Sequence, residues 1–238
     1  MYDLSGRTVV ISGASRGIGR ALARACAGEG ANLALLARTG DPVHALAMDL
    51  KKTFGIDAIG RACDIRDAGR VEAVIQEAGS RFGHLDLVVC NAGILGAMTT
   101  VVESDPQVWA NTIDVNLNGT FYLARCALRQ MKRRGGGRLL FVTSSVGRRV
   151  RPNWGAYCIS KVAVEGLARL IAAECPDGMA AFCVNPGGTA TDMRRAAFPS
   201  EDPATLPTTD EVAAAFLRIL RKNDPELNGE TFDARDFM

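Results

Sequence analysis

The sequence has no long apolar run, little histidine and no paired cysteines. No apolar stretch approaches the roughly 20 residues of a membrane-spanning helix, and no secretory leader precedes the apolar segment that begins at Thr8. The 2 histidines and 7 cysteines form no C-x-x-C pair and no zinc-type spacing, so no metal site is expected. The odd number of thiols indicates a reducing compartment. We therefore expect a cytoplasmic protein without a membrane segment.

Positive charge is also too sparse for a nucleic-acid surface. The formal net charge is +2, and the basic tracts at 132–134 and 148–151 are short, whereas nucleic-acid binding needs a wider basic stripe. Hydrophobic residues at 47% and charged residues at 23% are typical of a globular protein with a substantial core. Since we find no repeat, linker or low-complexity segment, the 238 residues are expected to form one domain, 1–238.

Short apolar runs alternate with longer segments of helical periodicity. Parallel strands are buried on both faces, so they form continuous apolar runs, and this alternation predicts a doubly wound α/β fold with a seven-stranded parallel sheet and helices on both faces. The expected strands are Thr8–Ser12, Asn32–Ala37, Ala58–Asp64, Leu85–Cys90, Arg138–Thr143, Met179–Val184 and, more weakly, Glu230–Phe232. The clearest expected helices are Ile18–Gly28, Asp105–Arg134 and Trp154–Glu174.

A glycine-rich turn follows the first expected strand. Gly13, Gly17 and Gly19 have the spacing G-x-x-x-G-x-G between this strand and the next helix. Glycine permits a tight turn and a close approach of backbone to a pyrophosphate, and the helix N-terminus attracts phosphate. An ordinary glycine-rich turn is the alternative, but the position after the first strand favours a dinucleotide site.

Further motifs follow in a characteristic order. They are Asp64 after the third strand, Asn91-Ala92-Gly93 after the fourth, Asn116, Ser144, Tyr157-x-x-x-Lys161, and Asn185-Pro186-Gly187. Over essentially its whole length the chain resembles the short-chain dehydrogenase/reductase family, which implies a Rossmann-type fold. Ser12 and Cys90 depart from the threonine and asparagine more often found there. The segments 144–148, 152–157, 186–189 and 198–203 also resemble a bacterial subfamily of short-chain oxidoreductases, a likeness that implies no particular substrate.

The resemblance implies an enzyme whose catalytic residues are Asn116, Ser144, Tyr157 and Lys161. Tyr157 and Lys161 are four residues apart, so they share one helix face. An ammonium group lowers a phenol's pKa, which lets Tyr157 exchange a proton with a substrate oxygen during hydride transfer. Ser144 is the expected hydrogen-bond donor to that oxygen, with Ser145 as the alternative. By the family's pattern Asn116 holds a water that links the lysine to solvent. The alternative for Asn116 is an amide that caps a helix or bridges the sheet. The alternative for Tyr157 and Lys161 is a pair on the surface of a helix.

The resemblance also implies a set of cofactor-binding residues. They are Gly13, Ser15, Arg16, Gly17, Ile18, Gly19, Arg38, Asp64, Ile65, Asn91, Ala92, Gly93, Tyr157, Lys161, Pro186, Gly187, Thr189 and Thr191.

The end of the second strand favours NADP(H) over NAD(H). Ala37 stands where an acid would bind the ribose 2′-hydroxyl of NAD, and Arg38 follows it, with Arg16 as a second arm for a 2′-phosphate. Asp41 lies too far along the loop to select NAD. We therefore expect an NADPH-dependent carbonyl reductase acting on a small molecule. An NAD-dependent alcohol dehydrogenase and a non-catalytic nucleotide-binding regulator are the alternatives.

The substrate side is less determined. Residues 188–209, including the proline-containing loop Phe198–Thr209, are expected to form a lid. Arginines near the site and Trp154 could form a mixed basic and aromatic pocket for a carboxylate or phosphate. The alternative is that most of the arginines face solvent or another subunit and that Trp154 is a packing residue. The arginines are Arg148, Arg149, Arg151, Arg194 and Arg195.

Two expected helical segments have too much apolar surface for helices with one face in water. The segments Phe121–Met131 and Val162–Ala173 are apolar on more than one side. Pairing with the same helices of a twin subunit would bury them, so at least a homodimer is expected. A tetramer is less expected, because the C-terminus lacks the Gly-Gly ending common in the family.

Overall fold

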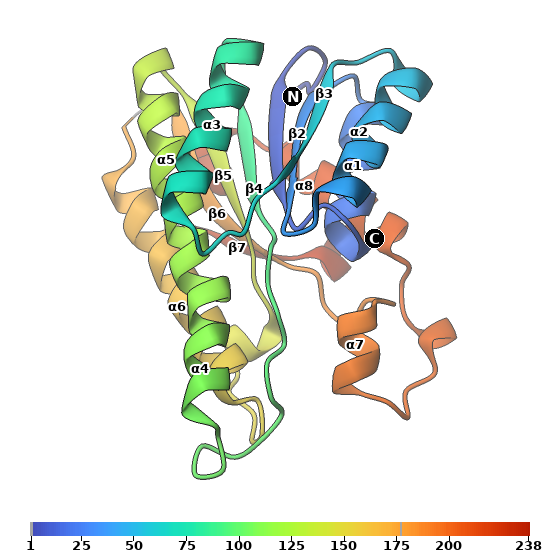
Figure 1. Ribbon diagram of the computed structural model, residues 1–238, viewed down its shortest axis with the longest axis vertical. Coiled ribbons are helices and arrows are strands. Elements are labelled where there is room, and N and C mark those ends of the chain that lie inside the picture. The colour runs from blue at the N-terminus through green and yellow to red at the C-terminus, as the bar shows by residue number, and fades with distance from the viewer. Residues whose placement is uncertain (1, 177) are drawn as a thin grey trace.

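The computed structural model describes residues 2–176 and 178–238 (Figure 1). Within these residues the strands form a seven-stranded parallel sheet in the order β3-β2-β1-β4-β5-β6-β7. This arrangement confirms the predicted Rossmann-type α/β fold. The strands are β1 Thr8–Ser12, β2 Asn32–Ala37, β3 Ala58–Ala62, β4 Leu87–Cys90, β5 Gly137–Val142, β6 Met179–Asn185 and β7 Thr231–Asp233. β3 ends two residues before the predicted Asp64, because its ladder with β2 stops at the pair Ala37–Ala62.

Helices cover both faces of the sheet. In Figure 1, α3, α5 and α6 lie on one face, and α1, α2 and α8 lie on the other. They are α1 Gly17–Gly28, α2 Gly40–Phe54, α3 Ala68–Phe82, α4 Pro106–Ile113, α5 Gly119–Arg134, α6 Gly155–Glu174, α7 Asp192–Ala197, α8 Thr209–Leu220 and α9 Asp224–Leu227. None of the helices in the described part of the chain is both long and apolar enough to cross a membrane.

Burial on both faces explains why the strands are apolar without alternation. Val9 and Ile11 of β1 belong to the core beneath α1, α2 and α8, whereas Val10 between them belongs to the core beneath α3, α5 and α6. All three side chains are completely buried. A polar side chain on either face of the strand would lose its hydration, so apolar residues are favoured along the whole strand.

One predicted helix is divided in the structure. The segment Asp105–Arg134 forms α4 and α5, joined by a π-helical turn, Asp114–Asn118. Such π-turns insert one residue into the helical repeat and occur often at functional sites. This turn contains Asn116, so the interruption coincides with a predicted site residue.

The sheet order reverses between β1 and β4, which are neighbours although two other strands separate them in sequence. From β1 the chain winds outward to β2 and β3, and from β4 it winds the other way. The loops that leave the carboxyl ends of β1 and β4 therefore diverge, and ligands of open α/β sheets bind in the crevice so formed.

Candidate active site

The glycine turn after β1 is shaped by close contacts and by left-handed backbone. A Cβ on Gly13 would lie 2.9 Å from the Cα of Ala92, and one on Gly19 would lie 2.4 Å from the Gly13 carbonyl oxygen. Gly17 differs, because its Cβ would meet only Thr191, at 3.7 Å, and its φ of +56° is what favours glycine. The turn thus packs tightly against the sheet on one side and leaves the start of α1 approachable on the other. Of the other residues predicted here, Ser15 and Ile18 are half-buried and Arg16 is exposed.

Ser12 and Asn91 hold the ends of β1 and β4 together. The Ser12 hydroxyl accepts hydrogen bonds of 3.0 Å from the backbone N–H groups of Asn91 and Ala92, and it donates to the Val89 carbonyl. In return, the Asn91 side-chain amide donates to the carbonyls of Ser12 and Gly13. From the sequence, Ser12 is only a departure from the family's usual threonine, because the partners of its hydroxyl, Asn91 and Ala92, follow a different strand.

Asn116 joins the loop after β4 to α6. Its Oδ1 accepts a 2.8 Å hydrogen bond from the Ile94 N–H, and its Nδ2 donates to the Ile94 carbonyl at 2.9 Å and to the Ser160 hydroxyl at 3.0 Å. A Cβ on Gly93 would lie 3.3 Å from Asn116 Oδ1 and 3.9 Å from Lys161 Nζ. The structure therefore brings three predicted site residues together, with the side chain of Asn116 acting as a bridge between segments.

Ser144, Tyr157 and Lys161 gather at the carboxyl end of β5. The Ser144 side chain lies close enough to the Tyr157 phenol to lower its pKa, whereas Ser145 is exposed, so the structure favours Ser144 over its neighbour. The Lys161 ammonium group donates a 2.8 Å hydrogen bond to the Val142 carbonyl and lies 5.7 Å from the centre of the Tyr157 ring. Tyr157 and Lys161 are both buried, which excludes the surface-pair interpretation.

The electrostatic balance at Tyr157 differs from the prediction. Burial raises the pKa of Tyr157, and the nearby Ser144 side chain offsets this only in part. Burial also lowers the pKa of Lys161 to about 8. The expectation that Lys161 lowers the pKa of Tyr157 is wrong for this structure, because the ammonium group faces the Val142 carbonyl and removal of the phenol from water has the larger effect.

Asp64, one of the predicted cofactor-binding residues, has a partner that the sequence did not indicate. The Arg66 guanidinium donates two hydrogen bonds to the Asp64 carboxylate, of 3.0 Å from Nε and 2.6 Å from Nη2. These hydrogen bonds lower the pKa of Asp64. The Ile65 side chain is buried against Gly119, where a Cβ would lie 2.6 Å away. Arg38 is exposed, and Arg16 lies 3.6 Å from Asp192.

The loop after β6 is fixed by its own hydrogen bonds. Gly187 has φ of +72°, and the buried Thr189 hydroxyl shares its single proton between the carbonyls of Pro186 and Gly187, each 3.4 Å away. The Thr191 hydroxyl caps α7 by accepting a hydrogen bond from the Arg194 N–H. A cavity of about 350 Å³ opens beside Gly17 and Thr191, between α1, this loop and the start of α8, so free space adjoins the glycine turn.

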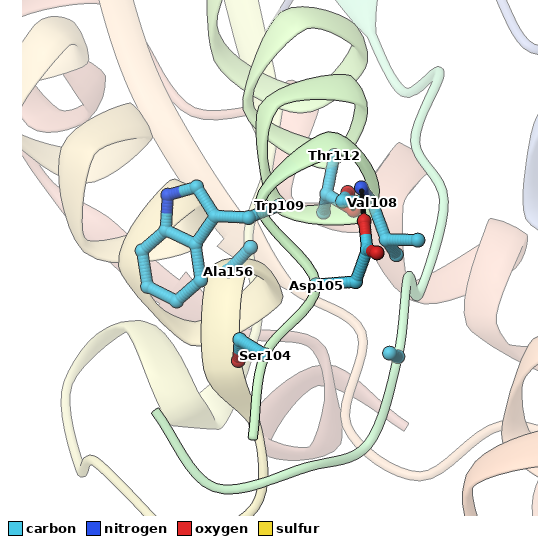
Figure 2. Close-up of a pocket in the computed structure, with 7 residues that line it drawn as sticks. Ser104, Asp105, Val108, Trp109, Thr112 and Ala156 are labelled. Carbon is cyan, nitrogen blue, oxygen red and sulfur yellow. Dashed lines mark hydrogen bonds between the residues drawn. The ribbon is translucent and has the colours of Figure 1, made fainter. Parts of the chain in front are cut away.

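A second pocket is far smaller. It has a volume of about 10 Å³, room for about one water. Figure 2 shows its lining, which comes mainly from α4 and the preceding loop, with Trp109 beside Ala156 of α6. This pocket cannot hold a substrate.

Three of the arginines predicted near the substrate already have carboxylate partners. Arg148 is bonded to Asp233 and lies 3.9 Å from the buried Glu165. Arg194 makes two 2.6 Å hydrogen bonds with Glu201, and Arg195 is paired with Asp192. The predicted basic pocket is therefore not formed by these three side chains, whereas Arg149 and Arg151 are exposed.

The fold and this arrangement of side chains are typical of an oxidoreductase with a Rossmann-type sheet, and comparison with known proteins agrees. The family model for short chain dehydrogenase matches residues 7–202. The chain therefore belongs to the short-chain dehydrogenase/reductase family and is an oxidoreductase acting on CH–OH or C=O groups.

Among relatives, the chain is 36% identical to the uncharacterized oxidoreductase YciK of Escherichia coli (strain K12), over 98% of this chain and 93% of YciK. A short-chain dehydrogenase from Shigella flexneri 2a str. 301, complexed with NADP, has a TM-score of 0.92 at 35% identity and covers 99% of this chain and 100% of its own. One from Escherichia coli CFT073, complexed with NADPH, has a TM-score of 0.92 at 36% identity and 98% coverage of each chain. These bacterial relatives confirm the narrower resemblance as well.

Proposed function

We propose that the protein is an NADPH-dependent carbonyl reductase with Tyr157 as its general acid/base. The observation that carries the proposal is that the buried Tyr157 ring lies 5.7 Å from the buried ammonium group of Lys161, with Ser144 close enough to the phenol to lower its pKa. Surface pairs of tyrosine and lysine are common, but these two side chains are buried and stand at the same edge of the sheet as the glycine turn. The proposed proton donor Tyr157, the hydroxyl of Ser144 and the glycine turn that would bind the dinucleotide thus lie at one edge of the sheet.

The glycine turn fits a dinucleotide, because Gly13 and Gly19 are packed too closely for any side chain while Gly17 leaves the start of α1 open. Arg38 and Arg16 are exposed and supply the guanidinium groups that a 2′-phosphate requires, and Ala37 offers no carboxylate to a ribose hydroxyl. The NADP and NADPH complexes of two similar structures support the same choice.

Each side chain has a distinct role in this proposal. The bound cofactor supplies the hydride that reduces the carbonyl carbon. Tyr157 donates its phenolic proton to the carbonyl oxygen, and Ser144 donates a hydrogen bond to that oxygen as negative charge develops. Lys161, fixed by its hydrogen bond to the Val142 carbonyl, places its ammonium group beside the phenol. Asn116 fixes the Ile94 segment beside them, and residues 188–209 act as the lid of a single-domain enzyme.

The test combines binding with turnover. Fluorescence titration with NADPH and NADH measures cofactor affinity, and a ketone and aldehyde panel measures reduction. Tyr157→Phe should lower kcat at least about 100-fold with nearly unchanged NADPH affinity. Ser144→Ala should also lower kcat, whereas Ser145→Ala, an exposed neighbouring hydroxyl, is the matched control. Turnover by Tyr157→Phe close to that of the wild type refutes the assignment.

The same measurements separate the alternatives. Preferred binding of NADH together with alcohol oxidation indicates an NAD-dependent dehydrogenase. Tight nucleotide binding without turnover of any carbonyl compound or alcohol indicates a regulator.

A further inference from the structure

Aromatic side chains extend from the proposed catalytic phenol to the proposed lid. The Trp154 ring lies 5.7 Å from the Tyr157 ring and 5.8 Å from the Phe198 ring, both at tilted angles of 48°. Trp154 precedes α6 and Phe198 follows α7, so the contact joins the active-site helix to the lid segment. Both side chains are half-buried, and each keeps part of its surface available for a further contact.

The neighbouring surface is apolar as well. Leu95, Trp154 and Met193 pack against a small core made of Val146, Tyr157 and Cys158. These residues come from the loop after β4, the segment before α6 and the start of α7. The groups that flank the phenol therefore favour a substrate that buries carbon surface and uses its carbonyl as the polar anchor.

The nearby cations are directed elsewhere. The Arg194 guanidinium lies 3.8 Å from the centre of the Phe198 ring and is held by two hydrogen bonds to Glu201. A cation in this position stabilises the orientation of the aromatic ring, and its fork is already occupied by a carboxylate. An anionic substrate would have to displace Glu201 in order to bind Arg194. Arg148 is occupied in the same way by Asp233.

On the basis of the proposed carbonyl reductase activity, we infer that the substrate is a neutral ketone or aldehyde bearing an aromatic ring, held against Trp154 and Phe198. These two residues then determine specificity. Phe198 contributes when the lid lies over the site, and Arg194 keeps its ring in place. The inference replaces the basic pocket that the sequence left open, since Arg148 and Arg194 bind the protein's own carboxylates and not a substrate.

The test compares three methyl ketones in the full-length protein with saturating NADPH: acetophenone, its 4-carboxylate, and an unbranched aliphatic ketone of equal carbon number. We expect kcat/KM for acetophenone to exceed that of each of the others by roughly tenfold, the factor that about 1.4 kcal/mol of stacking or desolvation produces. A preference for the carboxylate or for the aliphatic ketone overturns the inference.

Variants assign the effect to the two rings. Trp154→Leu and Phe198→Leu should each lower kcat/KM for acetophenone by roughly 3- to 10-fold, mainly through KM, with a smaller loss for the aliphatic ketone. Phe54→Leu replaces a partly exposed aromatic ring on α2, away from the site, and is the matched control. Equal losses for both ketones would mean that the rings serve only to support the lid, which also overturns the inference.

A binding measurement separates this inference from the proposed function. Saturation-transfer NMR reports acetophenone binding to the wild type and to Trp154→Leu in the presence of NADP⁺, without requiring turnover. Binding that depends on Trp154 but yields no reduction supports the aromatic site and refutes the reductase assignment. Reduction that depends on Tyr157 but favours the carboxylate, and is lost in Arg149→Ala or Arg151→Ala, supports the reductase and refutes the aromatic site.

Discussion

Lys161 donates a 2.8 Å hydrogen bond to the backbone carbonyl of Val142, the last residue of β5. This single contact ties α6 to the strand from which Ser144 emerges two residues later. It therefore sets the position of the ammonium group relative to the serine hydroxyl. It also leaves a cation in the interior with one backbone acceptor, an arrangement that lowers the pKa of Lys161 to about 8.

The depressed pKa of Lys161 predicts a pH dependence of stability. The folded state loses this proton near pH 8 and the unfolded state near 10.5, so the unfolded state binds more protons between these values. The free energy of unfolding contributed by this residue therefore rises with pH across that window. Relative to Lys161→Met, which removes the charge, the wild type should gain on the order of 2 kcal/mol from pH 7.5 to pH 10.

Urea denaturation of both proteins at the two pH values measures the difference. Subtracting the change in the free energy of unfolding of Lys161→Met from that of the wild type cancels the titration of the cysteines and tyrosines, which both proteins share. If the stability of the wild type and of Lys161→Met depends on pH in the same way, the prediction that the buried Lys161 has a lowered pKa is wrong.

Arg38 is expected to distinguish the two nicotinamide cofactors. Its side chain is exposed at the end of β2, where a 2′-phosphate would accept a charge-assisted hydrogen bond. Arg38→Ala should weaken NADPH binding by about 1.5–3 kcal/mol and leave NADH binding nearly unchanged, as measured by fluorescence titration. Arg133→Ala removes an exposed charge near the end of α5 and is the control. Equal affinity of the wild type for NADH and NADPH would refute the prediction that Arg38 and Arg16 bind a 2′-phosphate.

Asp233 is expected to stabilise two segments next to the proposed active site, those that contain Arg148 and Asn185. It accepts hydrogen bonds from Arg148, which follows the short 3-10 turn Ser145–Gly147, and from Asn185, which precedes Pro186. Arg148 lowers the pKa of Asp233, so this stabilisation is present at neutral pH and is lost as pH falls through that lowered pKa.

Asp233→Asn should cost about 1 kcal/mol, because partial exposure screens the pair. It should lower kcat more than NADPH affinity. Thermal unfolding and kinetics test this, with Asp236→Asn, an exposed acid of the same segment, as control. Wild-type stability and kcat in Asp233→Asn would show that the network is incidental.

The exposed apolar residues of α5 and α6 predict self-association. Phe121 is 43% exposed, Ile159 48%, Val162 39% and Leu170 56%, so a stripe of large side chains faces outward. Light scattering at micromolar concentration should give at least twice the 25.3 kDa chain mass, and Val162→Glu should shift the mass toward the monomer. The control is Met48→Glu on α2, where another exposed apolar side chain lies outside the stripe. A fully active wild-type monomer would contradict the prediction.

The sequence alone overestimated this surface. Val164 and Ile171 lie in the segment Val162–Ala173, which is expected to pack against a twin subunit, but both are buried in the core of the same chain. A helical pattern indicates that apolar residues surround a helix, whereas only the packing of neighbouring elements decides which of them remain uncovered.

The strands, the glycine turn and the order of the site residues could be predicted from the sequence, because each depends on local physics. A strand buried on both faces must be apolar throughout, as Val9, Val10 and Ile11 are. A turn with a positive φ favours glycine, as at Gly17. The spacing of Tyr157 and Lys161 places them on one helix face wherever that helix lies.

What only the tertiary structure decided is which partner each polar side chain meets. Arg148 is paired with Asp233, 85 residues away in sequence, and Lys161 with a carbonyl on a strand that no helical periodicity could identify. The sign of the pKa shift at Tyr157 follows from burial by residues of several segments. Electrostatic energies depend on distance and on removal from water, and both quantities exist only once segments remote in sequence have packed together.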